Sequence, residues 1–303
     1  MRLAEVISST VGRVSPKYRT LSQWIDTYDR IIEAKPISHK TKANRRSSLR
    51  HIHRRMGGAT ISAIKPHEVA EMVLDIHGEH PPLAKRVLIE SRDMFGEAVN
   101  YGWLERNPAA SVKMPVVHVT RKRLSFEHWC RIAEYSEQHM PAWVSRMLML
   151  ALVTGQRRSD LARMKFSDVW DDHLHVEQEK TGARLALPLA LQLEALGLTL
   201  GQVIDDCRGY YGTPSDFLLR KKSGKPLVLA SLSARFEEAR EGAYPGMTED
   251  APSLHECRSL SERLYREQGI DTMTLLGHKH QAMTDLYNDD RGLSRGKWKT
   301  LTL

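Results

Sequence analysis

Apolar side chains recur at steps of three and four residues through the first hundred residues, which is the spacing of one helical face. The pattern starts at Thr20, Gly57-Gly58 ends its second segment, and Asn107-Pro108 stops the series. The sequence therefore predicts a compact bundle of about four helices over residues 20–110. They are expected from Thr20 onward, over 40–56, over 67–77 and over 83–101.

The pattern changes after residue 123. Ser125 is expected to cap a helix, and another helix is expected to begin near Ser159. Residues 173–180 and 183–189 alternate on either side of Thr181-Gly182, which predicts a β-hairpin. The fold class is therefore mainly α (α+β), with a small antiparallel sheet. Further helices are expected over 142–153, 190–208, 229–241, 255–268, 271–277 and 280–288, and a short strand over 297–303.

The segment between these regions carries a proline and several cations and has no periodicity, as is typical of an interdomain linker. We therefore predict four parts. They are a lead-in at 1–16, a helical domain at 17–110, a linker at 111–123, and a second domain with a C-terminal tail at 124–303.

Composition narrows the class of protein. Hydrophobic residues make up 41% of the 303 residues, enough for a buried core. The longest apolar run, Met147–Val153, has seven residues, whereas a membrane span needs about 20. Cys130, Cys207 and Cys257 lie far apart, which argues against a disulfide framework or a zinc site. We expect a protein of a reducing, cytoplasmic compartment without a membrane partner.

The charge is unevenly distributed. Residues 1–123 hold 22 Lys and Arg against 12 Asp and Glu, a net charge of +10. Residues 124–303 hold 23 against 25, a net charge of −2. A basic region of this kind favours a polyanion as partner, and nucleic acid before a membrane.

The second domain contains residues that together could cleave a phosphodiester. Singly, each has an ordinary explanation, such as a surface arginine, a hairpin lysine or a core tyrosine. As a set, two arginines can bind the non-bridging phosphate oxygens, and a histidine can accept the proton of a tyrosine hydroxyl. A lysine can protonate the departing 5′ oxygen. In chain order the set is Arg157, Lys180, His255, Arg258, His278 and Tyr287, with Asp160 close to the first arginine.

The sequence favours a mechanism without a metal ion. No cluster of carboxylates suited to a pair of magnesium ions is visible. His51-x-His53 and His278-x-His280 have no acidic or cysteine partner at the spacing of a metal site. We therefore expect no metal and no other cofactor.

Four phrases around these residues resemble the tyrosine recombinases, and most closely the lambdoid phage integrases. They are VTGQRRSDLARMKFSDV, HVEQEKTGARLALP, LHECRSLSERLY and LLGHKHQAMTDLYNDDRG, and the resemblance spans about residues 20–303. It implies a helical core-binding domain followed by a catalytic domain. It also implies a site-specific DNA recombinase that integrates a phage or other mobile element through a 3′-phosphotyrosine, without ATP. Whether it also excises the element is left open.

The resemblance also implies a role for each candidate residue. These roles are phosphate binding for Arg157 and Arg258, general acid for Lys180, proton acceptor for His255, hydrogen bonding to the scissile phosphate for His278, nucleophile for Tyr287, and orientation of the first arginine for Asp160.

The family contacts double-stranded DNA from helix starts in the core-binding domain. Most such contacts go to phosphates, so binding is expected to weaken steeply with salt. The residues at matching positions here are Lys40, Thr41, Lys42, Asn44, Arg46, Lys85 and Arg86.

The resemblance implies that four protomers exchange two duplexes through a Holliday junction, with the tail packing on a neighbour. One departure is that fewer than 20 residues precede the helical domain, where lambdoid integrases carry an arm-binding domain. The chain is either shortened from a longer protein or a naturally shorter integrase. Control by accessory DNA-bending or directionality proteins is therefore in doubt.

Two alternatives remain at this stage. A type IB topoisomerase uses a similar residue set and would relax any supercoiled plasmid without a preferred sequence. A catalytically inactive helical DNA-binding protein would form no covalent complex on a nicked substrate. The complete residue set and the tail after Tyr287 favour the recombinase.

Overall fold

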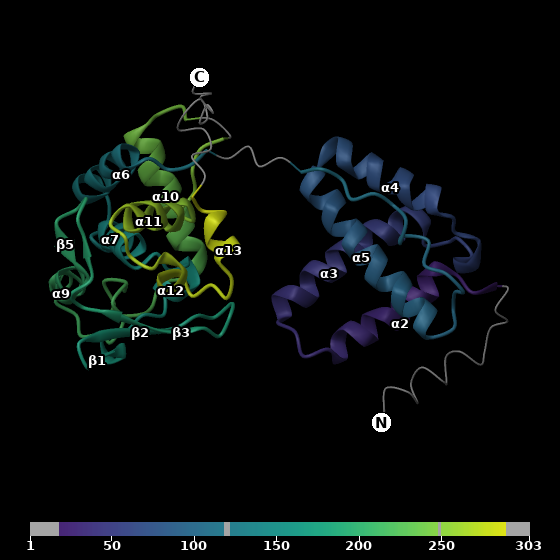
Figure 1. Cartoon of the computed structure of the whole chain (residues 1–303), viewed down its shortest axis with the longest axis horizontal. Helices are drawn as coiled ribbons and strands as arrows, with labels where there is room; N and C mark the ends of the chain where they lie inside the picture. The colour runs from purple at the N-terminus through teal and green to yellow at the C-terminus, as the bar shows by residue number, and fades with distance from the viewer. Residues whose placement is uncertain (1–17, 118–121, 248–249, 289–303) are drawn as a thin grey trace, which may run out of the picture. The chain divides into compact units, whose positions relative to one another are not determined.

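The structure is a computed structural model that describes residues 18–117, 122–247 and 250–288. Two compact units, Met1–Val119 and Thr120–Leu303, divide the chain (Figure 1). The mainly helical class with a small antiparallel sheet is confirmed.

The boundary between the units falls within the segment 111–123. The predicted domain limits, 17–110 and 124–303, themselves stay a prediction. The lead-in at 1–16 and the strand expected over 297–303 lie outside the described residues.

The first unit contains the predicted bundle of four helices. Thr20 caps the first of them in a capping box with Gln23, and Trp24 Nε1 donates to the carbonyl of Met94 at 3.0 Å. This bond fastens the first helix to the last, and the apolar faces form one core. The helices are α2 (Leu21–Ala34), α3 (His39–Met56), α4 (Pro66–Glu79) and α5 (Pro81–Asn100), with a 3₁₀ turn at Ile61–Ala63.

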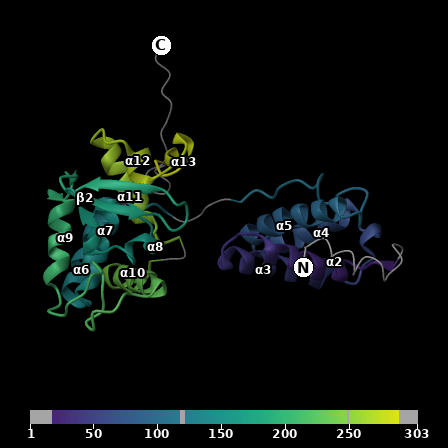
Figure 2. The ribbon, with the colours of Figure 1, turned by 90° about the horizontal axis from the view of Figure 1, so that it is seen from below.

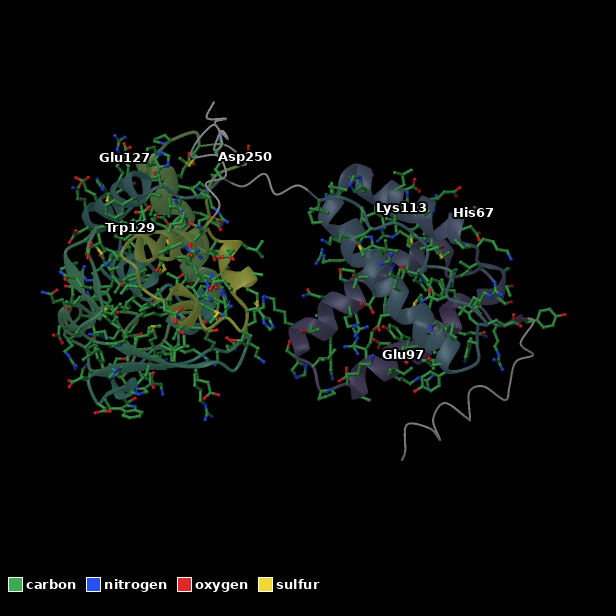
Figure 3. All side chains as sticks on the ribbon, viewed as in Figure 1. His67, Glu97, Lys113, Glu127, Trp129 and Asp250 are labelled. Carbon is green, nitrogen blue, oxygen red and sulfur yellow. The ribbon has the colours of Figure 1, made fainter. Side chains whose placement is uncertain are left out.

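The second unit is built around one buried helix, α7 (Trp143–Thr154), in which ten of twelve residues are buried. A helix that is apolar all round needs neighbours on every side. Trp129 of the adjacent helix is buried, whereas Glu127, two residues earlier, is exposed (Figure 3). The other helices are α6 (Phe126–His139), α8 (Arg158–Leu161), α9 (Leu200–Gly209), α10 (Leu229–Ala243), α11 (Glu256–Glu267), α12 (Thr272–Leu276) and α13 (Gln281–Asp285).

The predicted β-hairpin is present and forms part of a three-stranded antiparallel sheet in the order β1-β2-β3. Leu174 pairs with Leu187, and both side chains are buried in the core. The hairpin turn carries Lys180, because β2 ends earlier than expected. The strands are β1 (Val169–Trp170), β2 (His173–Glu177) and β3 (Arg184–Pro188).

The prediction of a helix over 190–208 is wrong in its first half. Residues 192–199 instead form a small antiparallel pair, β4 (Gln192–Leu193) and β5 (Leu198–Thr199). Gly197 adopts a left-handed φ of 66°, which turns the chain between these strands. The helix begins only at Leu200, because Thr199 caps it in a capping box. The two-residue strand β1 was too short for the alternation pattern to predict.

Two left-handed glycines end the helices that lead into the site. Gly155 ends α7 and Gly277 ends α12, each with a φ of 62°. Figures 1 and 2 show α12 beside the β2–β3 hairpin. The loop after α7, the hairpin turn, the start of α11 and the loop after α12 therefore meet in one part of the unit.

Candidate active site

Arg258 lies in the first turn of α11 and is almost completely buried, with 1% of its surface exposed. Its Nη1 donates to the carbonyl of Gly155 and its Nη2 to the carbonyl of Leu276, each at 2.6 Å. Burial, and then the charge of Arg157, lowers the pKa of Arg258 to about 10. The guanidinium is therefore still charged at neutral pH, and its hydrogen-bond partners in the structure are neutral groups.

His278 lies directly after Gly277 and is also buried. Its Nε2 faces Nη2 of Arg258 at 3.1 Å, and its Nδ1 faces Oγ1 of Thr284 at 2.9 Å. Because a guanidinium only donates, Nε2 must accept and Nδ1 carries the proton. Burial, and then the charges of Arg258 and Arg157, lowers the pKa of His278 to about 4. The imidazole is therefore neutral at pH 7.

Tyr287 follows α13, and its hydroxyl lies 3.3 Å from Nε2 of His255. The ring centroids of Tyr287 and His278 are 5.5 Å apart with an angle of 28° between the planes, and the guanidinium of Arg258 lies 5.7 Å from the centre of the phenol ring. Ser259 holds the backbone in place, since its hydroxyl donates to the carbonyl of Tyr287 at 2.8 Å. The tyrosine thus lies among two histidines and an arginine.

Arg157 and Lys180 are connected to this cluster through other residues. Arg157 Nη1 donates to Oε1 of Gln178 at 2.8 Å. Lys180 is exposed in the β2–β3 turn, and the residues on either side of it hold the turn. The amide of Glu179 donates to Asp160, and the hydroxyl of Thr181 donates to Gln178.

A hydrogen bond of Asp160 goes to the hairpin turn. Its Oδ1 accepts the backbone N–H of Glu179 at 3.0 Å, while the side chain of Arg157 is bonded to Gln178 instead. Asp160 is buried at the start of the short α8, close to the hairpin turn. In this structure it anchors the lysine-bearing turn, and its orientation of the first arginine stays a prediction.

Two of the residues expected to contact DNA form ion pairs with α2 in this structure, and their contact with DNA stays a prediction. Lys42 is buried, and its Nζ bonds the carboxylate of Glu33 at 3.0 Å. Arg46 forms ion pairs with Asp29 at 2.6 Å and with Glu33 at 2.8 Å. These two cations face α2 because acidic side chains of that helix lie opposite them. The others, Lys40, Thr41, Asn44, Lys85 and Arg86, are exposed.

Sequence reasoning missed several residues that organise the site. Gln178 had a usable signal, because it continues the inward positions Leu174 and Val176 of a strand with a period of two. A polar side chain at such a position needs buried partners. Thr284 had no such signal, since only the packing of α13 brings it to His278.

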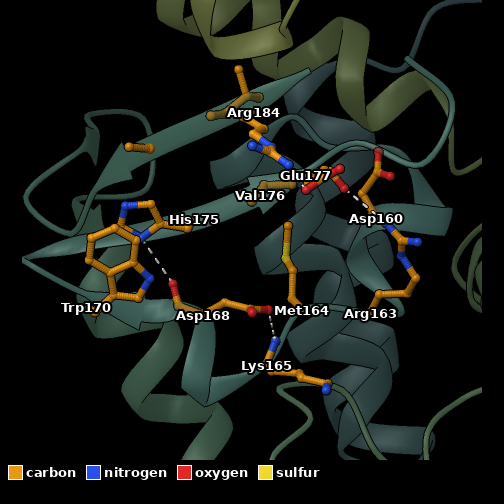
Figure 4. A pocket seen from close by; sticks show the side chains of 12 residues that line it. Asp160, Arg163, Met164, Lys165, Asp168, Trp170, His175, Val176, Glu177 and Arg184 are labelled. Atoms are coloured by element: carbon orange, nitrogen blue, oxygen red, sulfur yellow. Dashed lines mark hydrogen bonds and ion pairs between the residues drawn. The ribbon is translucent and has the colours of Figure 1, made fainter. Parts of the chain in front are cut away.

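A cavity of about 600 Å³ lies beside this cluster, between β2, β3 and the residues after α8 (Figure 4). The ring of Trp170 stacks on that of His175 at its edge, with centroids 3.5 Å apart. Asp160 is the one candidate catalytic residue that lines the cavity. The cavity is therefore separate from the phenol and the arginines.

Within residues 18–117, 122–247 and 250–288, no group of three His, Cys, Asp or Glu side chains could hold a metal ion. In the same segments, no helix has the length and apolar character that crossing a bilayer requires.

Comparison with known families identifies both units. The model of the "Phage integrase family" matches residues 122–292, and that of the "Phage integrase central domain" matches residues 21–114. Prophage integrase IntE of Escherichia coli (strain K12) is 40% identical over 304 residues, which cover 94% of this chain and 80% of that protein. The chain belongs to the phage integrase family.

Other relatives of the integrase agree with this assignment. The integrase of Enterobacteria phage P21 is 39% identical, and the match covers 90% of this chain and 75% of that protein. The integrase of Escherichia phage lambda is 36% identical, and the match covers 90% of this chain and 77% of that protein. A lambda integrase dimer bound to a COC′ core site has a TM-score of 0.86 and 34% identity, covering 94% of this chain and all of that one. The integrase is thus a tyrosine site-specific recombinase, which decides against the topoisomerase alternative.

Proposed function

We propose that the integrase cleaves and rejoins DNA at attachment sites with Tyr287 as the nucleophile. The observation that supports this most strongly is the 3.3 Å separation between the phenolic oxygen of Tyr287 and Nε2 of His255. That distance is close to the hydrogen-bond range of a general base, which often tightens when substrate binds, and the charged Arg258 lies against the same ring. The phenol has a reference pKa of about 10, so it needs both a proton acceptor and nearby positive charge.

In the proposed reaction, the oxygen of Tyr287 forms a bond to the scissile phosphorus while the bond from phosphorus to the 5′ oxygen breaks. The phenolic proton passes to His255, and the ammonium of Lys180 gives a proton to the departing oxygen. The products are a 3′-phosphotyrosine and a free 5′ hydroxyl. A 5′ hydroxyl of the second DNA then attacks the phosphotyrosine, so the phosphodiester is restored without ATP.

The two arginines are proposed to bind the non-bridging oxygens of this phosphate. Arg258 is buried and charged, and its hydrogen bonds go to two carbonyls and a neutral imidazole. Arg157 is bonded to a neutral amide. An incoming phosphate therefore meets positive charge that no hydrogen-bonded carboxylate has cancelled, and its own charge grows in the transition state.

His278 is proposed to change its protonation when the phosphate binds. In the free protein, its Nε2 accepts a hydrogen bond from Arg258. A phosphate would draw that N–H away, and its negative charge would raise the pKa of His278. The imidazole could then take up a proton and donate from Nε2 to the phosphate, with Nδ1 still held by Thr284.

The helical unit is proposed to hold the DNA through exposed cations at two helix ends. Lys85 and Arg86 lie at the start of α5, and Arg50 and Arg54 are exposed on α3. Burial, and then the charges of Arg54, Arg50 and Arg86, lowers the pKa of His51, which indicates that these cations gather in one place. Lys40, Thr41 and Asn44 extend this surface to the start of α3.

The assembly is proposed by analogy with a relative. A lambda integrase tetramer bound to a Holliday junction has a TM-score of 0.86 and 33% identity, covering all of this chain and 84% of that one. We propose that four copies of this integrase likewise join two duplexes, one of them from a phage or prophage. The reaction would take place in the cytoplasm of the bacterial host.

The test is covalent trapping on a nicked duplex that carries an attachment site. Wild-type integrase should form an adduct that survives denaturing electrophoresis, and Tyr287→Phe should form none while retaining DNA binding. Tyr211→Phe is the matched control, because it removes a hydroxyl from the same unit without touching the cluster, and it should leave the adduct yield unchanged.

An adduct formed by Tyr287→Phe would rule out this tyrosine as the nucleophile. Absence of an adduct with the wild-type protein, on DNA that it binds, would favour the inactive DNA-binding alternative. Sequencing of DNA that co-purifies as a covalent adduct would identify the attachment site.

A further inference from the structure

We infer that Gln178 is a positioning residue for the strand-cleavage reaction, and that its side-chain amide holds Arg157, the lysine-bearing turn and the loop before His278 in one arrangement. This inference rests on the proposed function. It is drawn from the hydrogen bonds around a buried amide that none of the proposed chemical steps uses.

The side chain of Gln178 is 1% exposed and uses its complete hydrogen-bonding capacity. Its Oε1 accepts from Arg157 Nη1 at 2.8 Å and from Thr181 Oγ1 at 2.7 Å. Its Nε2 donates to Oε1 of Gln156 at 2.8 Å and to the carbonyl of Leu276 at 2.9 Å. Four groups from three segments, namely the loop after α7, the hairpin turn and the end of α12, therefore meet at one amide.

The orientation of this amide follows from its partners. The guanidinium of Arg157 can only donate, and the carbonyl of Leu276 can only accept. A flipped amide would place N–H against N–H and oxygen against oxygen. A single orientation of Gln178 therefore satisfies both neighbours, which makes the amide a specific connector.

A second amide extends the connection into the core. Gln156 is 3% exposed, and its Nε2 donates to the carbonyls of Thr154 and Leu275, each at 2.9 Å. The end of α7 and the end of α12 are thus joined through Gln156 to Gln178. A shift of either helix end would be transmitted to the hairpin.

The carbonyl of Leu276 links Gln178 to the second arginine. It accepts from Gln178 Nε2 at 2.9 Å and from Arg258 Nη2 at 2.6 Å. Arg157 and Arg258 are therefore held by one continuous hydrogen-bonded chain. Contact with the following residue is equally close, since a Cβ on the left-handed Gly277 would lie 2.9 Å from Nε2 of Gln178.

The backbone of Gln178 closes the hairpin turn. Its N–H donates to the carbonyl of Ala183, and its carbonyl accepts from Gly182, each at 2.8 Å. Lys180 lies inside this turn, and the amide of Glu179 is bonded to Asp160. The base of the turn is thus fixed by Gln178 on one side and Asp160 on the other, while the lysine side chain extends into solvent.

The neutral charge of Gln178 fits this position. Arg157 and Arg258 repel each other, and this repulsion contributes to the lowered pKa of Arg258. A carboxylate at position 178 would hold Arg157 more strongly, but it would cancel charge needed for the phosphate. It would also lose the two bonds donated by Nε2. An amide positions the cations and leaves their charge available.

The experiment measures single-turnover cleavage of a nicked attachment-site duplex at saturating protein. Gln178→Met keeps the length of the side chain and removes all four hydrogen bonds. We expect its rate constant to fall about 100-fold, as for a displaced catalytic group, with DNA affinity within about twofold of wild type. Gln138→Met, on the exposed side of α6, is the matched control and should cleave at the wild-type rate.

A second substrate distinguishes positioning of the lysine from a general loss of structure. A 5′-bridging sulfur makes a leaving group that needs no protonation, so it bypasses Lys180. We expect the cleavage rate constant of Gln178→Met to be about tenfold higher on this substrate than on the unmodified duplex. The remaining loss of rate, which we attribute to the displaced Arg157, should persist. If Gln178→Met cleaved with the wild-type rate constant and only a smaller fraction of its molecules were active, the inference would be overturned.

Hydrogen exchange of the turn gives a readout that does not depend on activity. The amides of Glu179 and Gly182 should exchange at least about tenfold faster in Gln178→Met, because the turn keeps its backbone bonds but loses the side-chain bond to Thr181. Unchanged exchange there would overturn the inference, even if wild-type protein forms no adduct and the proposed function fails. If Gln178→Met does not fold, Gln178→Glu keeps the bonds from Arg157 and Thr181 and loses the two donated by Nε2, and it should still lose cleavage rate. A wild-type rate for Gln178→Glu would then overturn the inference.

Discussion

The helical unit and the active-site cluster of the integrase hold buried positive charge in opposite ways. In the helical unit, the guanidinium of Arg45 reaches the buried carboxylate of Glu90 at 3.0 Å and also contacts Asp93, and Lys42 is paired with Glu33. In the catalytic unit, Arg258 is more deeply buried, yet its hydrogen bonds go to carbonyls and an imidazole.

In these two places, the difference separates cations whose charge an ion pair cancels from a cation whose charge remains available. An ion pair cancels charge and fastens two helices together. A buried cation bonded to neutral groups keeps its charge and carries a desolvation cost of several kcal/mol, which an anion can offset. The active-site cluster is therefore suited to an anion, although the net charge of residues 124–303 is slightly negative.

The largest effect that would test this comparison is the loss of DNA-cleavage activity when Arg258 is replaced. Arg258→Gln keeps a donor for a carbonyl but removes the charge. Its cleavage rate should fall about 10²–10³-fold, because one well-placed donor to the phosphate is lost. Single-turnover cleavage measures this, with circular dichroism to verify the fold. A rate within tenfold of wild type would show that this buried charge does not serve the phosphate.

A somewhat smaller effect is expected on the stability of the helical unit. Arg45→Met leaves Glu90 buried without its cation and should lower the free energy of unfolding by about 2–3 kcal/mol. Arg55→Met is the control, because its ion pair with Asp75 is more than half exposed and should contribute less than about 1 kcal/mol. Urea unfolding measures both. Equal losses for the two variants would contradict the distinction between buried and exposed pairs.

The smallest effect is a pH dependence that comes from His278. Folding lowers the pKa of His278 from 6.5 to about 4. Between these pH values the histidine is protonated in the unfolded chain and neutral in the folded protein. The stability of the free protein should therefore fall as the pH drops through this range. Between pH 7 and pH 5, the free energy of unfolding should therefore fall by about 1–2 kcal/mol less in His278→Gln than in the wild type.

Urea unfolding at pH 7 and pH 5, followed by tryptophan fluorescence, provides the measurement. His67→Gln, at an exposed histidine of the helical unit, should leave the pH dependence unchanged (Figure 3). If His278→Gln loses as much stability as wild type between the two pH values, the cluster does not exclude a proton from this histidine.

The sequence by itself determined the fold class, the four-helix bundle, the β-hairpin and the residue types of the site. These features follow from local periodicity and from side-chain chemistry that does not depend on neighbours. The motifs around Arg157 and Tyr287 were also sufficient to indicate the family. The break in the expected helix at Gly197 and Thr199 shows the limit of periodicity, because a turn and a cap outweighed the apolar spacing.

Only the tertiary structure decided which groups meet. Gln178 and Leu276 are 98 residues apart, and Asp160 reaches Glu179 rather than Arg157 because of how α8 packs on the hairpin. Lys42 lies near the start of a helix that was expected to contact DNA, but its ammonium bonds the carboxylate of Glu33 on α2. Hydrogen bonds and ion pairs act over a few ångströms, so their partners depend on the packing of distant segments, which local sequence patterns do not contain.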